Sequence, residues 1–170
     1  MNEFISYYQI IKGENGMDYR IEKIDVELNL VGRGKSVKTS RAFKTVPTLW
    51  SGAKKDGFME KLIDLSWGPE EQPLGTLLGI CGQEAAIKDD DFIYFMGVRH
   101  EGQPPIGMET FTISHGTWAV FPKISEAWKR LYEEWLPNSG YQLANAPVIE
   151  CYYPPKHKPR NELWVPIIPQ

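Results

Sequence analysis

One stretch, residues 116–153, constrains the fold more than any other part of this 170-residue chain. It opens with an apolar run and continues with apolar residues at i, i+3, i+4 and i+7, the pattern of one helix face. We therefore expect a helix between two strands, with Ser125 as its N-cap and Pro137 and Gly140 at its end. The returning strand covers 147–153. The stripe consists of Ile124, Ala127, Trp128, Leu131, Tyr132 and Trp135.

The first half of the chain carries a looser version of the same unit. Residues 43–55 again have apolar positions at helical spacing. Pro47 suits the first turn of that helix and Gly57 suits its end. Residues 58–65 predict a short second helix. Further strands are predicted over 19–30, 74–81, 92–98 and 162–168, and over 108–121 with an interruption at 114–116.

Matching spacings relate the two halves, and they predict an α+β fold made of two strand-helix-strand-strand units with pseudo-two-fold symmetry. The helices would lie on one side of an antiparallel sheet. The helix-free faces would meet near the pseudo-axis and leave a ligand groove between the halves. The matched sets are Phe43, Val46, Leu49 and Trp50 with Phe121, Ile124, Ala127 and Trp128, and Leu78, Cys81, Ile93 and Tyr94 with Val148, Cys151, Leu163 and Trp164.

The whole chain, 1–170, is then expected to form a single domain. Residues 1–17 would be an N-terminal arm or linker, 18–100 the first repeat and 106–170 the second. The paired glycines Gly32 and Gly34 predict a bulge or a close approach of two backbones.

Composition limits the possible partners of the chain. The formal net charge is -3, which argues against a surface that neutralises nucleic-acid phosphates. No apolar run is long enough to span a bilayer, so we expect a cytoplasmic protein without a membrane partner. Only two cysteines are present, no metal-ligand spacing occurs, and we expect neither a metal nor a cofactor. The run 89–91 (Asp-Asp-Asp) is typical of a solvated turn.

Glu150 marks the clearest difference between the halves, because it takes the place of Ile80. In the strand alternation Glu150 shares a face with Val148 and Tyr152. Cys151 points the other way and is expected to face the helix. A carboxylate there is costly unless it is paired. Two interpretations stay open: a rim position, solvated or paired with Lys or Arg, and a cleft acid that awaits a cationic or hydrogen-bonding ligand. Glu162 replaces Phe92 at a strand start and is expected to be solvated.

Several motifs in this order resemble the GyrI-like family, which includes the effector-binding domains of AraC-type and MerR-type transcription regulators. The resemblance covers about residues 19–168 and is looser in the first half. It is carried by Gly116-Thr117-Trp118-Ala119-Val120-Phe121, Trp135-Leu136-Pro137, the spacing Pro147-x-x-Glu150-x-Tyr152, and Glu162-Leu163-Trp164-Val165-Pro166-Ile167.

The resemblance implies a groove that binds hydrophobic, often cationic, small molecules. An acid at the position of Glu150 would anchor the positive charge, and aromatic rings would stack on the ligand. Glu109 is a further candidate because an enzyme would need a second acid beside Glu150. Trp128 and Trp135 lie on the helix stripe and are assigned to the core. The remaining candidate ligand-binding residues are Trp118, Tyr152, Glu162, Trp50, Tyr94 and Trp164.

Three functions remain open. The first is a sensing or sequestering module for lipophilic compounds. The second is a hydrolase of reactive cyclopropane-type natural products, as in similar stand-alone GyrI-like proteins, with Glu150 as acid or base and Glu109 or Glu162 as its partner. The third is a protein-binding role, as in stand-alone members that engage DNA gyrase. No DNA-reading helix-turn-helix precedes Tyr19, so an upstream DNA-binding domain or a stand-alone protein is expected.

Overall fold

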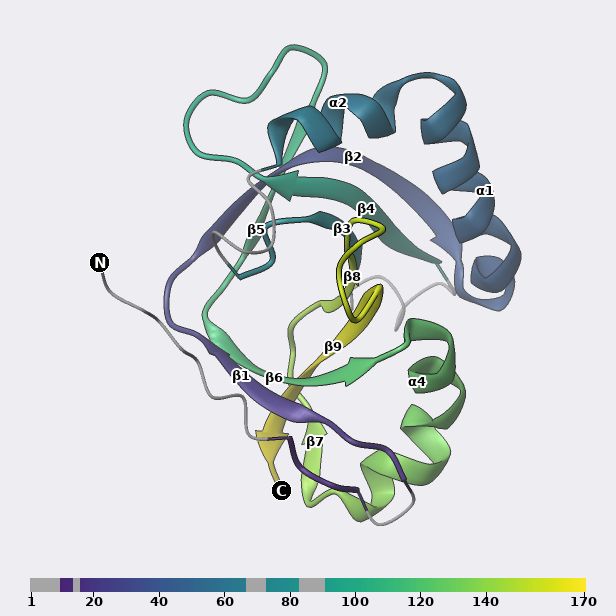
Figure 1. Ribbon diagram of the computed structural model, residues 1–170, viewed down its shortest axis with the longest axis vertical. Coiled ribbons are helices and arrows are strands. Elements are labelled where there is room, and N and C mark those ends of the chain that lie inside the picture. The colour runs from purple at the N-terminus through teal and green to yellow at the C-terminus, as the bar shows by residue number, and fades with distance from the viewer. Residues whose placement is uncertain (1–9, 14–15, 67–72, 83–90) are drawn as a thin grey trace.

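The computed structural model describes residues 10–13, 16–66, 73–82 and 91–170. Within these ranges, nine strands form one sheet, and all of their pairings are antiparallel (Figure 1). The strands are β1 (Arg20–Ile24), β2 (Leu28–Lys38), β3 (Leu77–Cys81), β4 (Asp91–Arg99), β5 (Glu109–Ile113), β6 (Gly116–Pro122), β7 (Tyr141–Leu143), β8 (Val148–Tyr152) and β9 (Asn161–Pro169).

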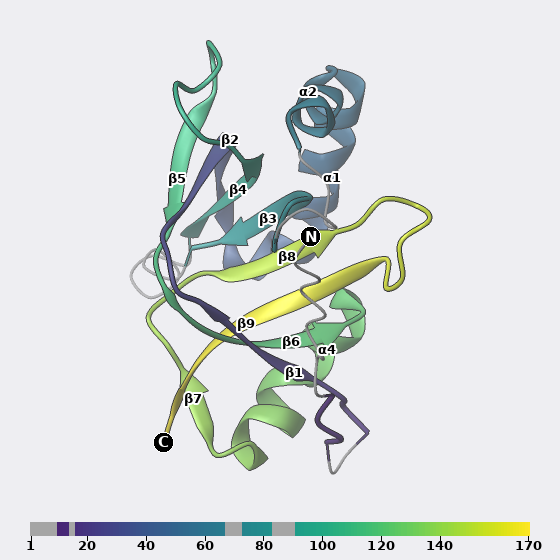
Figure 2. The ribbon, with the colours of Figure 1, turned by 60° about the vertical axis from the view of Figure 1, so that its left-hand side comes forward.

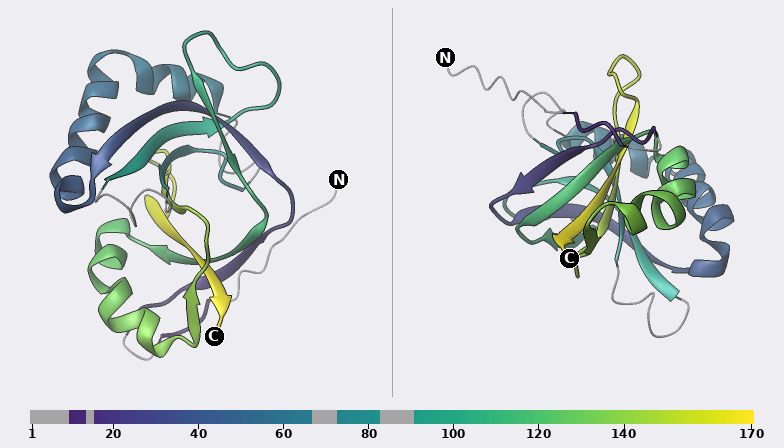
Figure 3. Two further views of the ribbon diagram at one scale, coloured as in Figure 1. Left: turned by 180° about the vertical axis from the view of Figure 1, so that it is seen from behind. Right: turned by 90° about the horizontal axis from the view of Figure 1, so that it is seen from below.

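The helices are α1 (Ala42–Lys55), α2 (Phe58–Leu65) and α4 (Ile124–Arg130). A 3₁₀ turn, Thr39–Arg41, precedes α1. α4 continues as a π-helical turn, Leu131–Trp135, and then as a 3₁₀ turn, Leu136–Asn138. These three described helices lie on the same side of the sheet, as the front and back views show (Figures 1 and 3).

The strand order is β1-β6-β9-β8-β3-β4-β2-β5, with β7 paired to β9. Reading from each half towards the middle, β6-β9-β8 corresponds to β2-β4-β3, and β8 pairs with β3 at the centre. Figure 2 shows β8 and β9 crossing the middle of the molecule between the α1–α2 pair and α4. The predicted α+β architecture with helices on one side is confirmed. Duplication as the origin of the two halves stays a prediction.

At each edge of the sheet, a strand from one half of the sequence pairs with a strand from the other half. β1 pairs with β6, and β5 pairs with β2. The single strand predicted over 19–30 is two strands, because the chain bends at Val26, whose side chain is exposed. β2 then runs through both glycines. A Cβ on Gly32 would lie 2.0 Å from the Met96 carbonyl oxygen, so the predicted close backbone approach is present.

Among the described residues, an apolar core occupies the helix-free face of the sheet, where the sequence predicted the ligand groove, and the cavity described below lies on the helix side instead. This core includes Leu30, Leu78, Phe95, Trp118 and Ile149. Cys151 belongs to the same core, so it is buried but faces away from the helices. Two further cores lie on the helix side, one under α1 and α2 and one under α4.

Three local predictions are corrected. Pro47 lies inside α1 rather than in its first turn. Ser125 does not cap α4, because the Asn161 side chain on β9 accepts a hydrogen bond from the Ile124 N–H at 2.7 Å. The predicted core position of Trp135 is confirmed, since it is buried against Phe121 and its neighbours. The short strand β7 was not predicted. In the acidic run 89–91, only the third aspartate lies within the described residues.

Candidate functional site: a buried carboxylate under aromatic rings

Glu150 lies in the middle of β8, and only 6% of its surface is exposed. Its side chain faces the helices and accepts three hydrogen bonds from aromatic side chains. Oε1 accepts from the hydroxyls of Tyr94 at 2.7 Å and Tyr152 at 3.2 Å. Oε2 accepts from the Trp128 indole N–H at 3.0 Å. The carboxylate is therefore held by neutral donors, and its position is fixed from two strands and one helix.

A glycine makes the contact between Tyr94 and Glu150 possible. Tyr94 is on β4 and Glu150 is on β8, and β3 lies between these strands. Gly79 of β3 pairs directly with Glu150. A Cβ at Gly79 would lie 2.0 Å from the Tyr94 hydroxyl oxygen and 3.1 Å from Glu150 Oε1. The missing side chain therefore leaves the space in which the hydroxyl meets the carboxylate.

Trp50 of α1 completes the group from the side opposite to α4. Its indole N–H donates to the Tyr94 hydroxyl oxygen at 2.7 Å. Its ring also packs edge-on against the Tyr152 ring, with centroids 5.3 Å apart. Trp50, Tyr94, Trp128 and Tyr152 thus surround Glu150; we call these five residues the Glu150 cluster. Aromatic side chains from α1 and α4 therefore converge on one acid.

Burial and the neighbouring charge keep the tyrosines of the cluster protonated. Desolvation, and then the Glu150 carboxylate, raise the pKa of Tyr94 well above its ordinary value. The same two causes raise the pKa of Tyr152. Both hydroxyls therefore remain donors at neutral pH. Burial and Glu150 also raise the pKa of Cys81, so that its thiol is a poor nucleophile.

No basic side chain among the described residues forms an ion pair with Glu150. Removing a carboxylate from water costs several kcal/mol, and neutral hydrogen bonds return only part of this cost. The charge of Glu150 is therefore uncompensated within the part of the chain that the structure describes. A cation bound beside it would find a countercharge and several π faces.

Glu162 shows the opposite arrangement and corrects the expectation that it is solvated. It is 2% exposed and faces the apolar core with Cys151, its partner across β8 and β9. Arg20 of β1 binds both of its carboxylate oxygens, and the Tyr153 hydroxyl donates to one of them. The Arg20 guanidinium also lies over the Trp164 ring. The charge of Glu162 is thus matched inside the protein.

Of the candidates predicted from sequence, the structure brings together Glu150, Tyr152, Tyr94 and Trp50. It places Trp118, Glu162 and Trp164 on the other face of the sheet. Glu109 is exposed on β5, where it accepts a hydrogen bond from the Gly34 N–H. A ligand-binding role for any of these residues stays a prediction.

The sequence reasoning missed two members of this site. Trp128 was assigned to the core, yet its N–H reaches the acid. The repeat could have found it, because Trp128 matches Trp50 in spacing and Trp50 was already a candidate. Gly79 gave a weaker signal: an isolated glycine in a strand indicates a close approach, and this one lies in 74–81.

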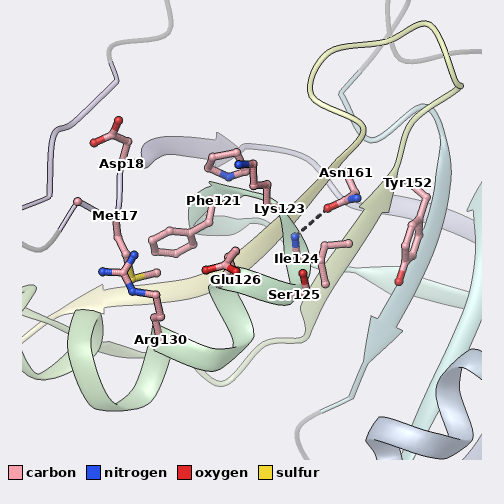
Figure 4. A pocket seen from close by; sticks show the side chains of 13 residues that line it. Met17, Asp18, Phe121, Lys123, Ile124, Ser125, Glu126, Arg130, Tyr152 and Asn161 are labelled. Carbon is pink, nitrogen blue, oxygen red and sulfur yellow. Dashed lines mark hydrogen bonds between the residues drawn. The ribbon is translucent and has the colours of Figure 1, made fainter.

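A cavity of about 750 Å³ lies beside the start of α4 (Figure 4). Met17, Phe121, Lys123, Glu126 and Arg130 contribute to its walls, and Tyr152 forms another part of the wall. Glu150 does not line this cavity. Tyr152 is thus the point at which the cavity and the Glu150 cluster meet.

Within the described ranges, no group of three or more His, Cys, Asp or Glu side chains is placed to hold a metal ion. No described helix is both long and apolar enough to cross a membrane.

Similarity to known proteins extends over nearly the whole chain. A family model, the GyrI-like small molecule binding domain, matches residues 17–168. The structure of SAV2435 bound to tetraphenylphosphonium has a TM-score of 0.75 at 18% identity, covering 89% of this chain and 94% of that one. A putative transcription regulation protein from Staphylococcus aureus MU50 has a TM-score of 0.66 at 21% identity, covering 89% and 99%.

EcmrR in a complex with DNA has a TM-score of 0.51 at 15% identity, covering 99% of this chain and 60% of that one. No curated protein matches this chain. At these identities the solved structures establish the common fold, whereas the family model covers most of the sequence. The chain belongs to the GyrI-like small-molecule-binding family.

Proposed function

We propose that this protein binds hydrophobic, cationic small molecules at the Glu150 cluster. The observation that carries the proposal is a buried carboxylate that accepts hydrogen bonds from Tyr94, Tyr152 and Trp128 but has no described basic partner. Glu162 is the internal comparison, since the same side chain on the next strand is paired with Arg20. A buried acid left without a countercharge is expensive for folding, and a ligand would supply that countercharge.

The chemistry of the cluster suits a cation that carries apolar groups. Attraction between opposite charges is stronger in a poorly solvated site than in water. The rings of Trp50 and Tyr152 add apolar surface and cation–π attraction. Because Glu150 already accepts three hydrogen bonds, a ligand needs a positive charge more than it needs further donors.

The relatives support the same class of ligand without establishing it for this chain. SAV2435 has been solved with tetraphenylphosphonium, and other similar structures belong to a putative transcription regulator and to a DNA complex. We propose that this chain is either the effector-binding domain of a regulator or a stand-alone drug-binding protein. The upstream DNA-binding domain and the cytoplasmic location remain part of this proposal.

A charge-matched set of ligands tests the proposal. Tetraphenylphosphonium and tetraphenylborate have nearly the same shape and opposite charges, and triphenylphosphine oxide is a neutral aromatic relative. We expect the phosphonium to bind and to quench tryptophan fluorescence, and the borate to fail. Glu150→Gln removes the charge but keeps the size of the side chain, and should weaken phosphonium binding at least about tenfold. Isothermal calorimetry gives the affinities.

Glu60→Gln on the exposed face of α2 is the matched control, because it removes a charge of the same sign outside the cluster. It should bind like the wild type. Equal binding of phosphonium and borate, or full affinity in Glu150→Gln with native circular dichroism, would contradict the proposal.

The ligand recovered afterwards is examined by mass spectrometry. For the hydrolase alternative, the same variants are incubated with a cyclopropane-bearing electrophile, and its Glu150-dependent consumption would favour an enzyme.

A further inference from the structure

The Glu150 carboxylate is closed off in this structure, so a ligand cannot reach it without a movement. Glu150 is almost fully buried, and Tyr94 is completely buried beside it. Neither residue lines either of the two cavities described for this chain, nor do Trp50 and Trp128. Access to the proposed site is therefore a separate question from affinity for it.

Tyr152 is the member of the Glu150 cluster that also faces a cavity. Its hydroxyl donates to Glu150, and its side chain forms part of the wall of the cavity beside α4. Figure 4 places Tyr152 at one end of this cavity, beyond Ile124 and Ser125. Tyr152 is also the last residue of β8, and the chain leaves the strand directly after it. We propose that the cavity beside α4 is the access route to Glu150 and that Tyr152 is the gate between them.

The hydrogen bonds of Glu150 are graded in a way that suits a gate. The Tyr152 bond is the longest of the three, at 3.2 Å, against 2.7 Å for Tyr94 and 3.0 Å for Trp128. When the Tyr152 side chain turns towards the cavity, Glu150 keeps a donor on each of its oxygens. Opening therefore breaks the longest of the three bonds and leaves the carboxylate held in place by Tyr94 and Trp128.

The charges around the cavity fit a passage better than a final binding site. Asp18 is bonded to Lys12, and Arg130 is bonded to Glu134, both at 2.6 Å. Both pairs are formed within the chain, and Lys123 and Glu126, which also line the cavity, carry opposite charges, so the wall offers a passing cation little net charge. The buried carboxylate without a described basic partner, Glu150, lies further in. A lipophilic cation would move through the cavity past Phe121 and bind beyond Tyr152. This inference rests on the proposed function.

Association rates test the gate, with tetraphenylphosphonium as the probe and stopped-flow tryptophan fluorescence as the readout. Tyr152→Phe keeps the ring and removes the hydroxyl that holds the gate shut. Because the open form becomes more populated, the association rate constant should rise about tenfold. Tyr94→Phe is the matched control, since it removes a hydroxyl from the same carboxylate oxygen but lines neither cavity. It should leave the association rate unchanged and raise the dissociation rate.

Filling the cavity gives an independent test. Ser125 is exposed and lines the cavity, so Ser125→Phe should slow association while the Glu150 cluster stays intact. Lys129→Phe, on an exposed part of α4 outside the cavity, should bind at the wild-type rate. If Tyr152→Phe changes only the dissociation rate, as expected for Tyr94→Phe, the proposed gate is wrong. It is also wrong if Ser125→Phe associates at the wild-type rate. In either case Glu150-dependent binding still stands. If the wild type does not bind the phosphonium, the proposed function fails and the gate fails with it.

Discussion

Two glutamates on adjacent strands show how one residue type can serve two purposes. Glu162 faces the apolar core and is neutralised by Arg20, so its charge is matched within the protein. Glu150 faces the helices and has neutral donors only. A buried ion pair is easily damaged, because losing one partner leaves a bare charge in a poorly solvated environment.

Arg20→Met tests how much the ion pair between Arg20 and Glu162 contributes to stability. Arg20 is the only side chain with a described ion pair to Glu162. The variant should lower the free energy of unfolding by about 3 kcal/mol, because a buried carboxylate loses its countercharge. Urea denaturation followed by circular dichroism measures the change. Lys12→Met is the control: it breaks an exposed ion pair with Asp18 and should cost less than about 1 kcal/mol. Similar losses in the two variants would contradict this account.

Among the elements, α4 connects the candidate site to the core below it. Trp128 on its first turns donates to Glu150, and Trp135, the last residue of the π-helical turn, packs against Phe121 and Tyr19. The start of the helix is held by β9, because Asn161 accepts the Ile124 N–H. One helix is thus attached to the sheet at its beginning, at Trp128 and at its end. π-helical turns are often found near functional sites.

Asn161→Ala tests the attachment at the start of α4. The unpaired helix N–H should cost about 1 kcal/mol of unfolding free energy, the usual value for a lost N-terminal cap. Ser125→Ala should leave stability unchanged, although its sequence position is the one typical of a cap. Thermal unfolding of both variants decides between these residues. A larger loss in Ser125→Ala would show that the cap is local after all.

At the scale of the whole molecule, the site lies where the two halves meet. β3 and β8 pair at the centre of the sheet, and Gly79 faces Glu150 across that pairing. α1 supplies Trp50 from one half, and α4 supplies Trp128 from the other. Neither half alone contains the acid and its full ring of donors. The central pairing is therefore what assembles the site.

Gly79→Ala tests this assembly. The added methyl group would overlap the Tyr94 hydroxyl, which must then move away from Glu150. We expect phosphonium affinity to fall about tenfold and stability to fall by about 1–3 kcal/mol, because a buried hydrogen bond to a charged group is lost. Gly82→Ala is the control, since the nearest described atom to its Cβ would be the Ile93 carbonyl oxygen at 3.5 Å. Calorimetry and urea denaturation should separate the two variants; equal behaviour would contradict the role of Gly79.

Much of the fold was predictable because periodicity is a local property of the chain. The bounds of the helix at 58–65 and the strands around Tyr94 and Glu150 follow from alternating and helical patterns. Glu150 itself stood out as an acid in an apolar strand. Val26 shows the limit of this reasoning, since it continues the alternation but lies at a bend with its side chain largely exposed.

The sequence by itself thus determined most of the elements, the layering of helices on one side and the unusual acid. Only the tertiary structure decided which groups satisfy each charge. Trp128 and Tyr94 lie 22 and 56 residues from Glu150, and Arg20 lies 142 residues from Glu162. Such partners depend on strand order and register, and a shift of one residue turns a side chain to the opposite face. Local patterns carry no information about that choice. They therefore could not show that Glu162 is paired with Arg20 whereas Glu150 has no described basic partner.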